Sequence, residues 1–140
     1  MRGTTRDPSR TIEIESAGAE AWVADPDRIA TLVPALEHVT IVCVLLGSAR
    51  GSSEALAALH GPRLEMLVRR LLDTTMHGIL YEVAGSVPSE FLGRGAEFVR
   101  RECERFRIPF SLLDADPEDH AAWRAAALAA VEQLVKASTR

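Results

Sequence analysis

The chain has 140 residues and a mass of 15.2 kDa, with 47% hydrophobic residues, 26% charged residues and a formal net charge of -4. This composition fits one globular domain over residues 1–140 and excludes a disordered or fibrous chain. An acidic balance without clustered Lys and Arg argues against a nucleic-acid partner. No apolar run approaches the length of about 18 residues that a membrane-spanning helix needs, and no signal peptide is recognisable. We therefore expect a cytoplasmic protein that does not associate with membranes.

Four elements are predicted before residue 47. In order they are a helix over 8–17, a strand over 20–24, a helix over 26–37 and a strand over 39–46. Gly18 closes the first helix, since glycine adopts a positive φ readily. Asp25 is the expected N-cap of the second helix, with Pro26 at its first position. The last strand is continuously apolar and β-branched, which is typical of a strand buried on both faces of a parallel sheet.

The second half of the chain alternates helices and strands. The pattern predicts a small-residue loop over 47–53, a helix ending at Leu72, a strand over 78–84, a charged helix ending at Phe106, a strand over 108–113 and a helix over 117–136. Gly61-Pro62 should kink the first of these helices, and Asp116 should cap the last. Ala96, Val99, Cys103 and Phe106 share one helical face. Strands separated by helices predict an α/β fold, with a mainly parallel sheet of about four or five strands between helical layers.

Cysteine and histidine usage points to neither a disulfide framework nor a metal centre. Cys43 lies in an apolar run, where we expect it to be buried, and Cys103 lies in a charged helix, so both are predicted to be reduced. The four histidines are His38, His60, His77 and His120. None of them has metal-ligand spacing. No Gly-x-Ser-x-Gly elbow indicates a Ser-His-Asp hydrolase.

Three short segments resemble the NmrA-like group of atypical short-chain dehydrogenase/reductases. They are RGTTRDP at 2–8, AGAE at 17–20 and ADP at 24–26. In that group a strand runs into an Arg after Thr or Ser, a helix ends in Ala-Gly-Val-Glu, and the next strand ends in Gly-Asp. The resemblance covers roughly residues 2–115. It implies a Rossmann-like three-layer sandwich that binds NADP or NAD.

The same resemblance implies positions for the cofactor. Arg6 would lie beside the adenosine ribose or its 2′-phosphate, and Asp25 beside the adenine. The residues that flank the middle of the cofactor would follow the buried strand, because ligands of open α/β sheets bind beyond the carboxyl ends of the strands. The full set is Thr5, Arg6, Asp25, Pro26, Leu46, Gly47 and Ser48.

Each of these positions also has a plainer structural interpretation. Arg6 can be a solvated surface residue, and Asp25 a helix cap. Gly47-Ser48 can be a loop that needs small residues. Ser86 falls at the catalytic-serine position of the family, and there too a turn residue is the simpler interpretation.

The family's glycine-rich phosphate loop, G-x-G-x-x-G, has no counterpart in the chain, which begins after the place where the first strand and that loop should be. That strand is central in the Rossmann order, so the strands over 20–24 and 39–46 would lack their usual common neighbour. Two interpretations follow. Either the chain is N-terminally shortened, which we favour, or its strands pair anew, for example in a dimer.

The reductase pair of the family, Tyr-x-x-x-Lys, is missing as well. Tyr81 is the single tyrosine, its fourth neighbour is Gly85, and Lys136 is remote in sequence. In the family this lysine lowers the pKa of the tyrosine, which then acts as a general acid. NmrA-like proteins without the pair act as cofactor sensors. We therefore expect a NAD(P)-binding or NAD(P)-sensing domain without catalytic residues; the alternative is a structural, self-associating domain that has lost cofactor binding.

Overall fold

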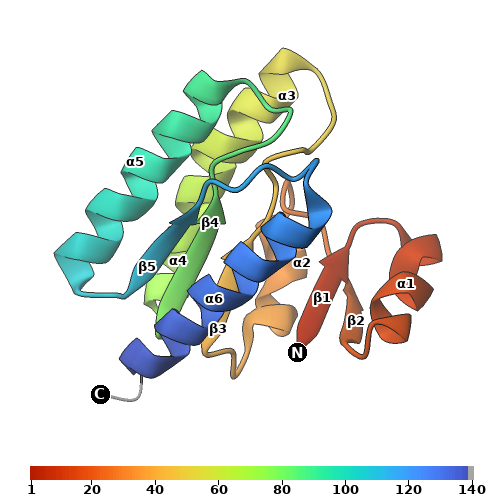
Figure 1. The fold of residues 1–140 in the computed structure, drawn as a ribbon, viewed down its shortest axis with the longest axis horizontal. Coiled ribbons are helices and arrows are strands. Elements are labelled where there is room, and N and C mark those ends of the chain that lie inside the picture. The colour runs from red at the N-terminus through yellow and green to blue at the C-terminus, as the bar shows by residue number, and fades with distance from the viewer. Residues whose placement is uncertain (139–140) are drawn as a thin grey trace. The chain divides into compact units, whose positions relative to one another are not determined.

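The computed structural model describes residues 1–138 and divides into two compact units. The first comprises Met1–Glu37 and the second begins at His38. Figure 1 shows the ribbon, in red and orange for the first unit. Within residues 1–138, no helix combines the length and apolar character required to cross a membrane.

The first unit is built on a two-stranded parallel sheet. Strand β1 (Arg2–Thr5) pairs with β2 (Glu20–Val23), and a 3-10 turn (Pro8–Arg10) and α1 (Thr11–Ser16) connect them. Gly18 follows α1 with a φ of 89°, so the predicted left-handed helix end is confirmed. The unit ends with α2 (Ile29–Leu32) and a second 3-10 turn (Val33–Leu36).

The predicted helix over 26–37 starts later and is shorter than expected. The Asp25 carboxylate accepts the Asp27 N–H at 2.9 Å and so closes a tight turn instead of capping a helix. The helix begins only at Ile29. Pro34 lies in the following 3-10 turn, and it cannot continue the α-helical ladder because it has no N–H. The prediction that Asp25 is an N-cap was therefore wrong.

The second unit holds a three-stranded parallel sheet in the order β3 (Ile41–Val44), β4 (Gly78–Glu82) and β5 (Phe110–Leu113). Its helices are α3 (Ser53–Ala58), α4 (Leu64–Leu72), α5 (Ser89–Phe106) and α6 (His120–Ser138). The α/β class and the parallel pairing are confirmed. The five strands fall into two sheets, because no pairing joins β1 or β2 to β3 within residues 1–138.

Helices cover both faces of the three-stranded sheet (Figure 1). Successive side chains of β4 point to opposite faces. On one face Leu80 packs with Leu113 of β5 and Leu134 of α6. On the other face Tyr81 reaches α5, where its hydroxyl approaches Gly95 so closely that a Cβ there would stand 2.1 Å from it.

The predicted kink between the two helical segments near residue 61 is confirmed. A π-helical turn (Leu59–Arg63) joins α3 to α4, and within it Gly61 has non-helical angles of φ -115° and ψ -107°. Pro62 follows. The turn carries His60, which is buried. A kink that the sequence marks by glycine and proline thus places a histidine in the interior.

Three further expectations are corrected. Cys43 is exposed rather than buried, because its side chain points to the opposite face of β3 from Val42 and Val44, which are buried. On α5, Phe106 is 49% exposed, whereas Glu102 is buried beside Cys103. Helix α6 begins at His120, since Asp119 accepts the Ala122 N–H, while Asp116 accepts the Glu118 N–H in the preceding turn.

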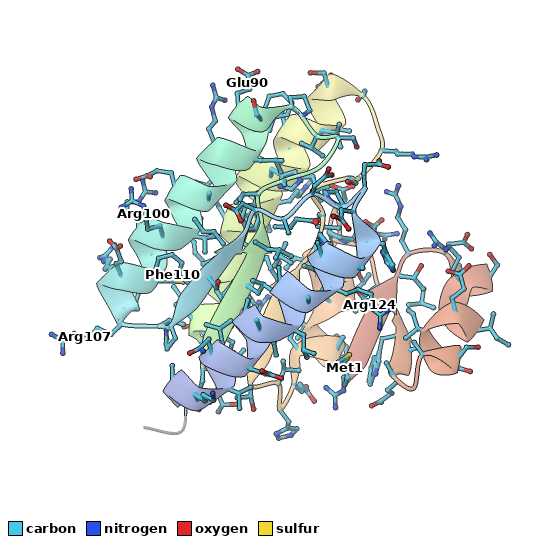
Figure 2. The ribbon with its side chains drawn as sticks, in the orientation of Figure 1. Met1, Glu90, Arg100, Arg107, Phe110 and Arg124 are labelled. Atoms are coloured by element: carbon cyan, nitrogen blue, oxygen red, sulfur yellow. The ribbon has the colours of Figure 1, made fainter. Side chains whose placement is uncertain are left out.

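The outer face of α5 is charged and solvated, as the alternating signs predict. Arg100 pairs with Glu97 one turn before it and lies 3.9 Å from Glu104 one turn after it. Figure 2 shows the side chains of Arg100 and Glu90 projecting away from the sheet. This face therefore offers solvated charge rather than a site.

Candidate functional site

A cavity opens at the carboxyl ends of β3 and β4. Its volume is about 360 Å³, and the residues that line it are Leu45, Leu46, Ser48, Ala49, Glu82, Pro117, His120 and Trp123. Ligands of open parallel sheets bind at this edge. Leu46 and Ser48, both predicted from sequence, line the cavity, and Gly47 between them is buried.

Two glycines let the loops after β3 and β4 cross in contact. A Cβ at Gly47 would stand 2.1 Å from the Ala84 carbonyl oxygen, and one at Gly85 would stand 2.1 Å from the Gly47 carbonyl oxygen. That Gly47 carbonyl accepts the Val87 N–H at 3.0 Å. No larger residue fits at either position without moving the backbone. The structure therefore requires glycine at position 47 whether or not a ligand binds.

Glu82 is a buried carboxylate at the end of β4. One oxygen, Oε1, accepts the Gly47 N–H at 2.9 Å, and the other, Oε2, accepts the Trp123 indole N–H at 2.7 Å. The charge is thus held by two N–H donors. Over the described residues, no three His, Cys, Asp or Glu side chains gather as a metal site. The sequence analysis did not identify Glu82 as a site residue, although a charged residue at the end of an apolar strand could have indicated it.

The first turn of α6 supplies an aromatic wall to the cavity. The rings of His120 and Trp123 are nearly parallel, with 5° between their planes and 6.5 Å between their centroids. His120 is exposed, whereas Trp123 is half-buried and fixed by its bond to Glu82. The cavity thus has an aromatic wall beside the Glu82 side chain.

A buried histidine lies behind the cavity. His60 Nε2 is 3.0 Å from the Leu46 carbonyl oxygen, and His60 Nδ1 is 2.5 Å from the Tyr81 hydroxyl. A carbonyl only accepts, so Nε2 carries the hydrogen and Nδ1 accepts the Tyr81 O–H. Burial lowers the pKa of His60 and raises the pKa of Tyr81 far above its ordinary value. The imidazole is therefore neutral, with one fixed tautomer.

The remaining predicted residues belong to the first unit. Thr5 ends β1 and Arg6 follows it, while Asp25 and Pro26 come after β2. Because β1 and β2 are parallel, the structure brings these four residues to one edge of the sheet. Arg6 is exposed. Thr5 Oγ1 accepts the Asp7 N–H at 3.1 Å. Leu46, Gly47 and Ser48 lie in the other unit.

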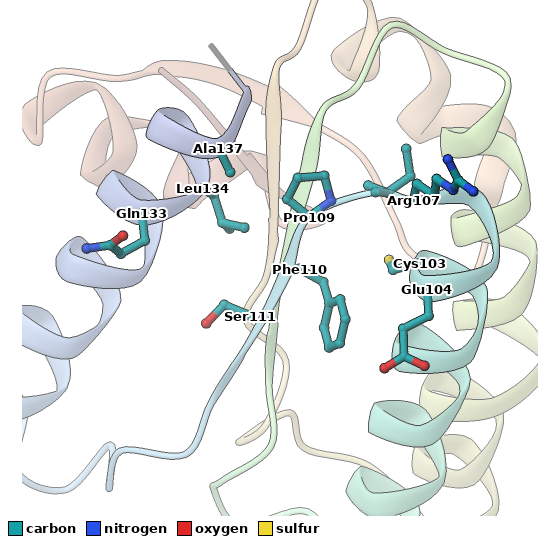
Figure 3. Close-up of a pocket in the computed structure, with 10 residues that line it drawn as sticks. Cys103, Glu104, Arg107, Pro109, Phe110, Ser111, Gln133, Leu134 and Ala137 are labelled. Carbon is teal, nitrogen blue, oxygen red and sulfur yellow. The ribbon is translucent and has the colours of Figure 1, made fainter. Parts of the chain in front are cut away.

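A second cavity, of about 470 Å³, lies at the amino end of β5 (Figure 3). Phe110 and Cys103 lie on its α5 side and Leu134 on its α6 side. Burial, reinforced by the charge of Glu102, raises the pKa of the Cys103 thiol to about 11. The thiol is therefore protonated and unreactive at neutral pH. This cavity lies at the opposite edge of the sheet from the strand ends where α/β proteins bind ligands.

No protein-family model matches the sequence, and no curated protein matches it. Its fold is similar to that of a triphenylmethane reductase from Citrobacter sp., whose crystal structure was determined in complex with NADP(H). The TM-score is 0.59 at 15% sequence identity, over 80% of this chain and 38% of the reductase chain. The chain thus spans well under half the length of that enzyme. At this identity the likeness establishes the Rossmann-like fold and nothing finer.

Proposed function

We propose that the chain binds a nicotinamide dinucleotide, NADP or NAD, and acts as a binding or sensing domain rather than as an enzyme. The observation that carries this proposal is the cavity at the carboxyl ends of β3 and β4, lined by Leu46, Ser48 and Glu82. It occupies the edge at which Rossmann-like folds receive dinucleotides. The likeness to a reductase crystallised with NADP(H) supports the ligand class.

We assign no catalytic group, because Tyr81, the single tyrosine of the sequence, is not placed to act as a general acid. This tyrosine is fully buried, and its hydroxyl is engaged by His60. A general acid must reach the atom that it protonates, and Tyr81 does not line the cavity. Ser86 is exposed, and its backbone N–H lies 3.4 Å from Ser48 Oγ. Binding without turnover is the function that fits these positions.

For the first unit, taken by itself, we propose that Arg6 binds a ribose 2′-phosphate. Arg6 is exposed just beyond β1, where a guanidinium can meet a 2′-phosphate. Thr5, Asp25 and Pro26 lie at the same edge of the β1–β2 sheet. The 2′-phosphate would make NADP the preferred cofactor.

Isothermal titration of the chain with NADPH and NADH tests the proposal. We expect saturable heat with NADPH, and binding about 10- to 150-fold weaker after Arg6→Ala, since one charge-assisted hydrogen bond contributes about 1.5–3 kcal/mol. NADH affinity should not change. Arg100→Ala on the solvated face of α5 is the matched control. No heat with either cofactor would remove the proposal.

A second candidate, self-association, is favoured by the composition of β3. Within residues 1–138 this strand pairs only with β4, so its other edge is unpaired. Ile41–Val44 contains neither a charged residue nor a proline. These are the residues that usually prevent an edge strand from pairing with another chain. Light scattering after size exclusion should then give a dimer mass that Val42→Pro abolishes. A monomer at all concentrations would exclude this candidate.

A further inference from the structure

One peptide group at the mouth of the cavity is held from both faces of the sheet. The Leu46 carbonyl accepts from His60 Nε2–H at 3.0 Å, and the N–H of the same peptide, on Gly47, donates to Glu82 Oε1 at 2.9 Å. Tyr81 and Glu82 are consecutive in β4, so their side chains point to opposite faces. Tyr81 holds His60 on one face, and Glu82 acts directly on the other.

Several features of the structure support this arrangement, and ordinary side-chain packing would not require them. An imidazole and a phenol are buried together and satisfied by one another, which avoids the cost of unpaired polar groups. His60 is carried by the kink at Gly61-Pro62 between α3 and α4, where Gly61 has non-helical angles. Gly95 leaves room for the Tyr81 hydroxyl. All of these features converge on the orientation of one peptide.

We propose that His60 is a positioning residue of the binding site, which sets the orientation of the Leu46–Gly47 peptide and thereby presents Leu46 and Ser48 to the ligand. His60 itself does not line the cavity, so any effect of it on binding passes through that peptide. Without the imidazole the Leu46 carbonyl would lose its buried side-chain donor and keep only the Ala49 N–H at 3.3 Å, so the peptide would be held less firmly. This inference rests on the proposed dinucleotide site.

Two His60 variants distinguish positioning from plain packing. His60→Leu fills a similar volume but supplies no donor, whereas His60→Gln can return an N–H near the position of Nε2. Losing the bond should weaken NADPH binding by roughly tenfold and speed exchange of the Gly47 and Ser48 amides by a similar factor. His60→Gln should recover both quantities to within about threefold of wild type.

Leu134→Ala is the control for stability, because Leu134 is a buried residue of α6 that does not line this cavity. It should lower the melting temperature yet leave NADPH affinity and the exchange of the Gly47 amide unchanged. The inference is overturned if His60→Leu leaves Gly47 exchange as in wild type, or if Leu134→Ala weakens binding as much as His60→Leu does. If the wild-type chain binds no dinucleotide, the proposed function fails, while the exchange measurements still decide whether His60 holds the peptide.

Discussion

His60 makes stability depend on pH in a direction that its surroundings determine. Burial lowers its pKa below the ordinary value of 6.5, so the unfolded chain binds this proton more readily than the folded one. The stabilising contribution of the neutral imidazole is therefore complete above pH 6.5 and is lost as pH falls through the folded-state pKa. Urea denaturation between pH 5 and pH 8 should show this decline. His60→Gln should flatten it, and an unchanged slope in that variant would contradict the assignment.

Two glycines on α5 should respond oppositely to alanine. At Gly95 the new Cβ would meet the buried Tyr81 hydroxyl, and overpacking of this kind costs about 1–3 kcal/mol. At Gly93 no atom stands within 4 Å of the new Cβ, so the helix should gain about 1 kcal/mol. Chemical denaturation of both variants measures the difference. Equal effects would mean that Tyr81 does not approach α5 as described.

At the scale of the element, α6 contributes stability through one face. Leu134 is 4% exposed and belongs to the cluster with Leu80 and Leu113, whereas Leu128 is 61% exposed on the same helix. Leu134→Ala should cost about 2–4 kcal/mol of unfolding free energy. Leu128→Ala should change it by less than about 0.5 kcal/mol. A large loss at Leu128 instead would show that another surface covers it.

Element types were predictable where the deciding interaction is local. The kink at Gly61-Pro62 and the positive φ of Gly18 follow from the backbone of those residues alone. The start of the second helix was not predictable in this way. Asp25 had two local uses for its carboxylate, a helix cap and a tight turn, and the turn prevailed.

At the scale of the whole molecule, the two units differ in how much they bury. Among the described residues of the first unit, the buried hydrophobic side chains are Ala24, Leu32 and Ala35. A two-stranded sheet with so small a core is marginal. Strand β4, in contrast, is buried along its full length.

Hydrogen exchange should separate these two levels of protection. We expect the amides of β2 (Glu20–Val23) to exchange at least about tenfold faster than those of β4 (Gly78–Glu82), because they open locally without global unfolding. Mass spectrometry measures the exchange of peptides from both strands in one sample, so β4 serves as the internal reference for β2. Equal protection of β2 and β4 would show that the first unit is stabilised by more than its own core.

The sequence by itself determined the α/β class, the parallel strands and the small-residue loop at Gly47-Ser48, because hydrophobic period and glycine placement act over a few residues. Only the tertiary structure decided which polar groups meet. His60 and Tyr81 are 21 residues apart, and Glu82 and Trp123 are 41 apart. Their pairing depends on how the α3–α4 segment and α6 pack against the sheet. The shape of the cavity and the orientation of the Leu46–Gly47 peptide depend on these long-range hydrogen bonds, which cannot be predicted from a local sequence pattern.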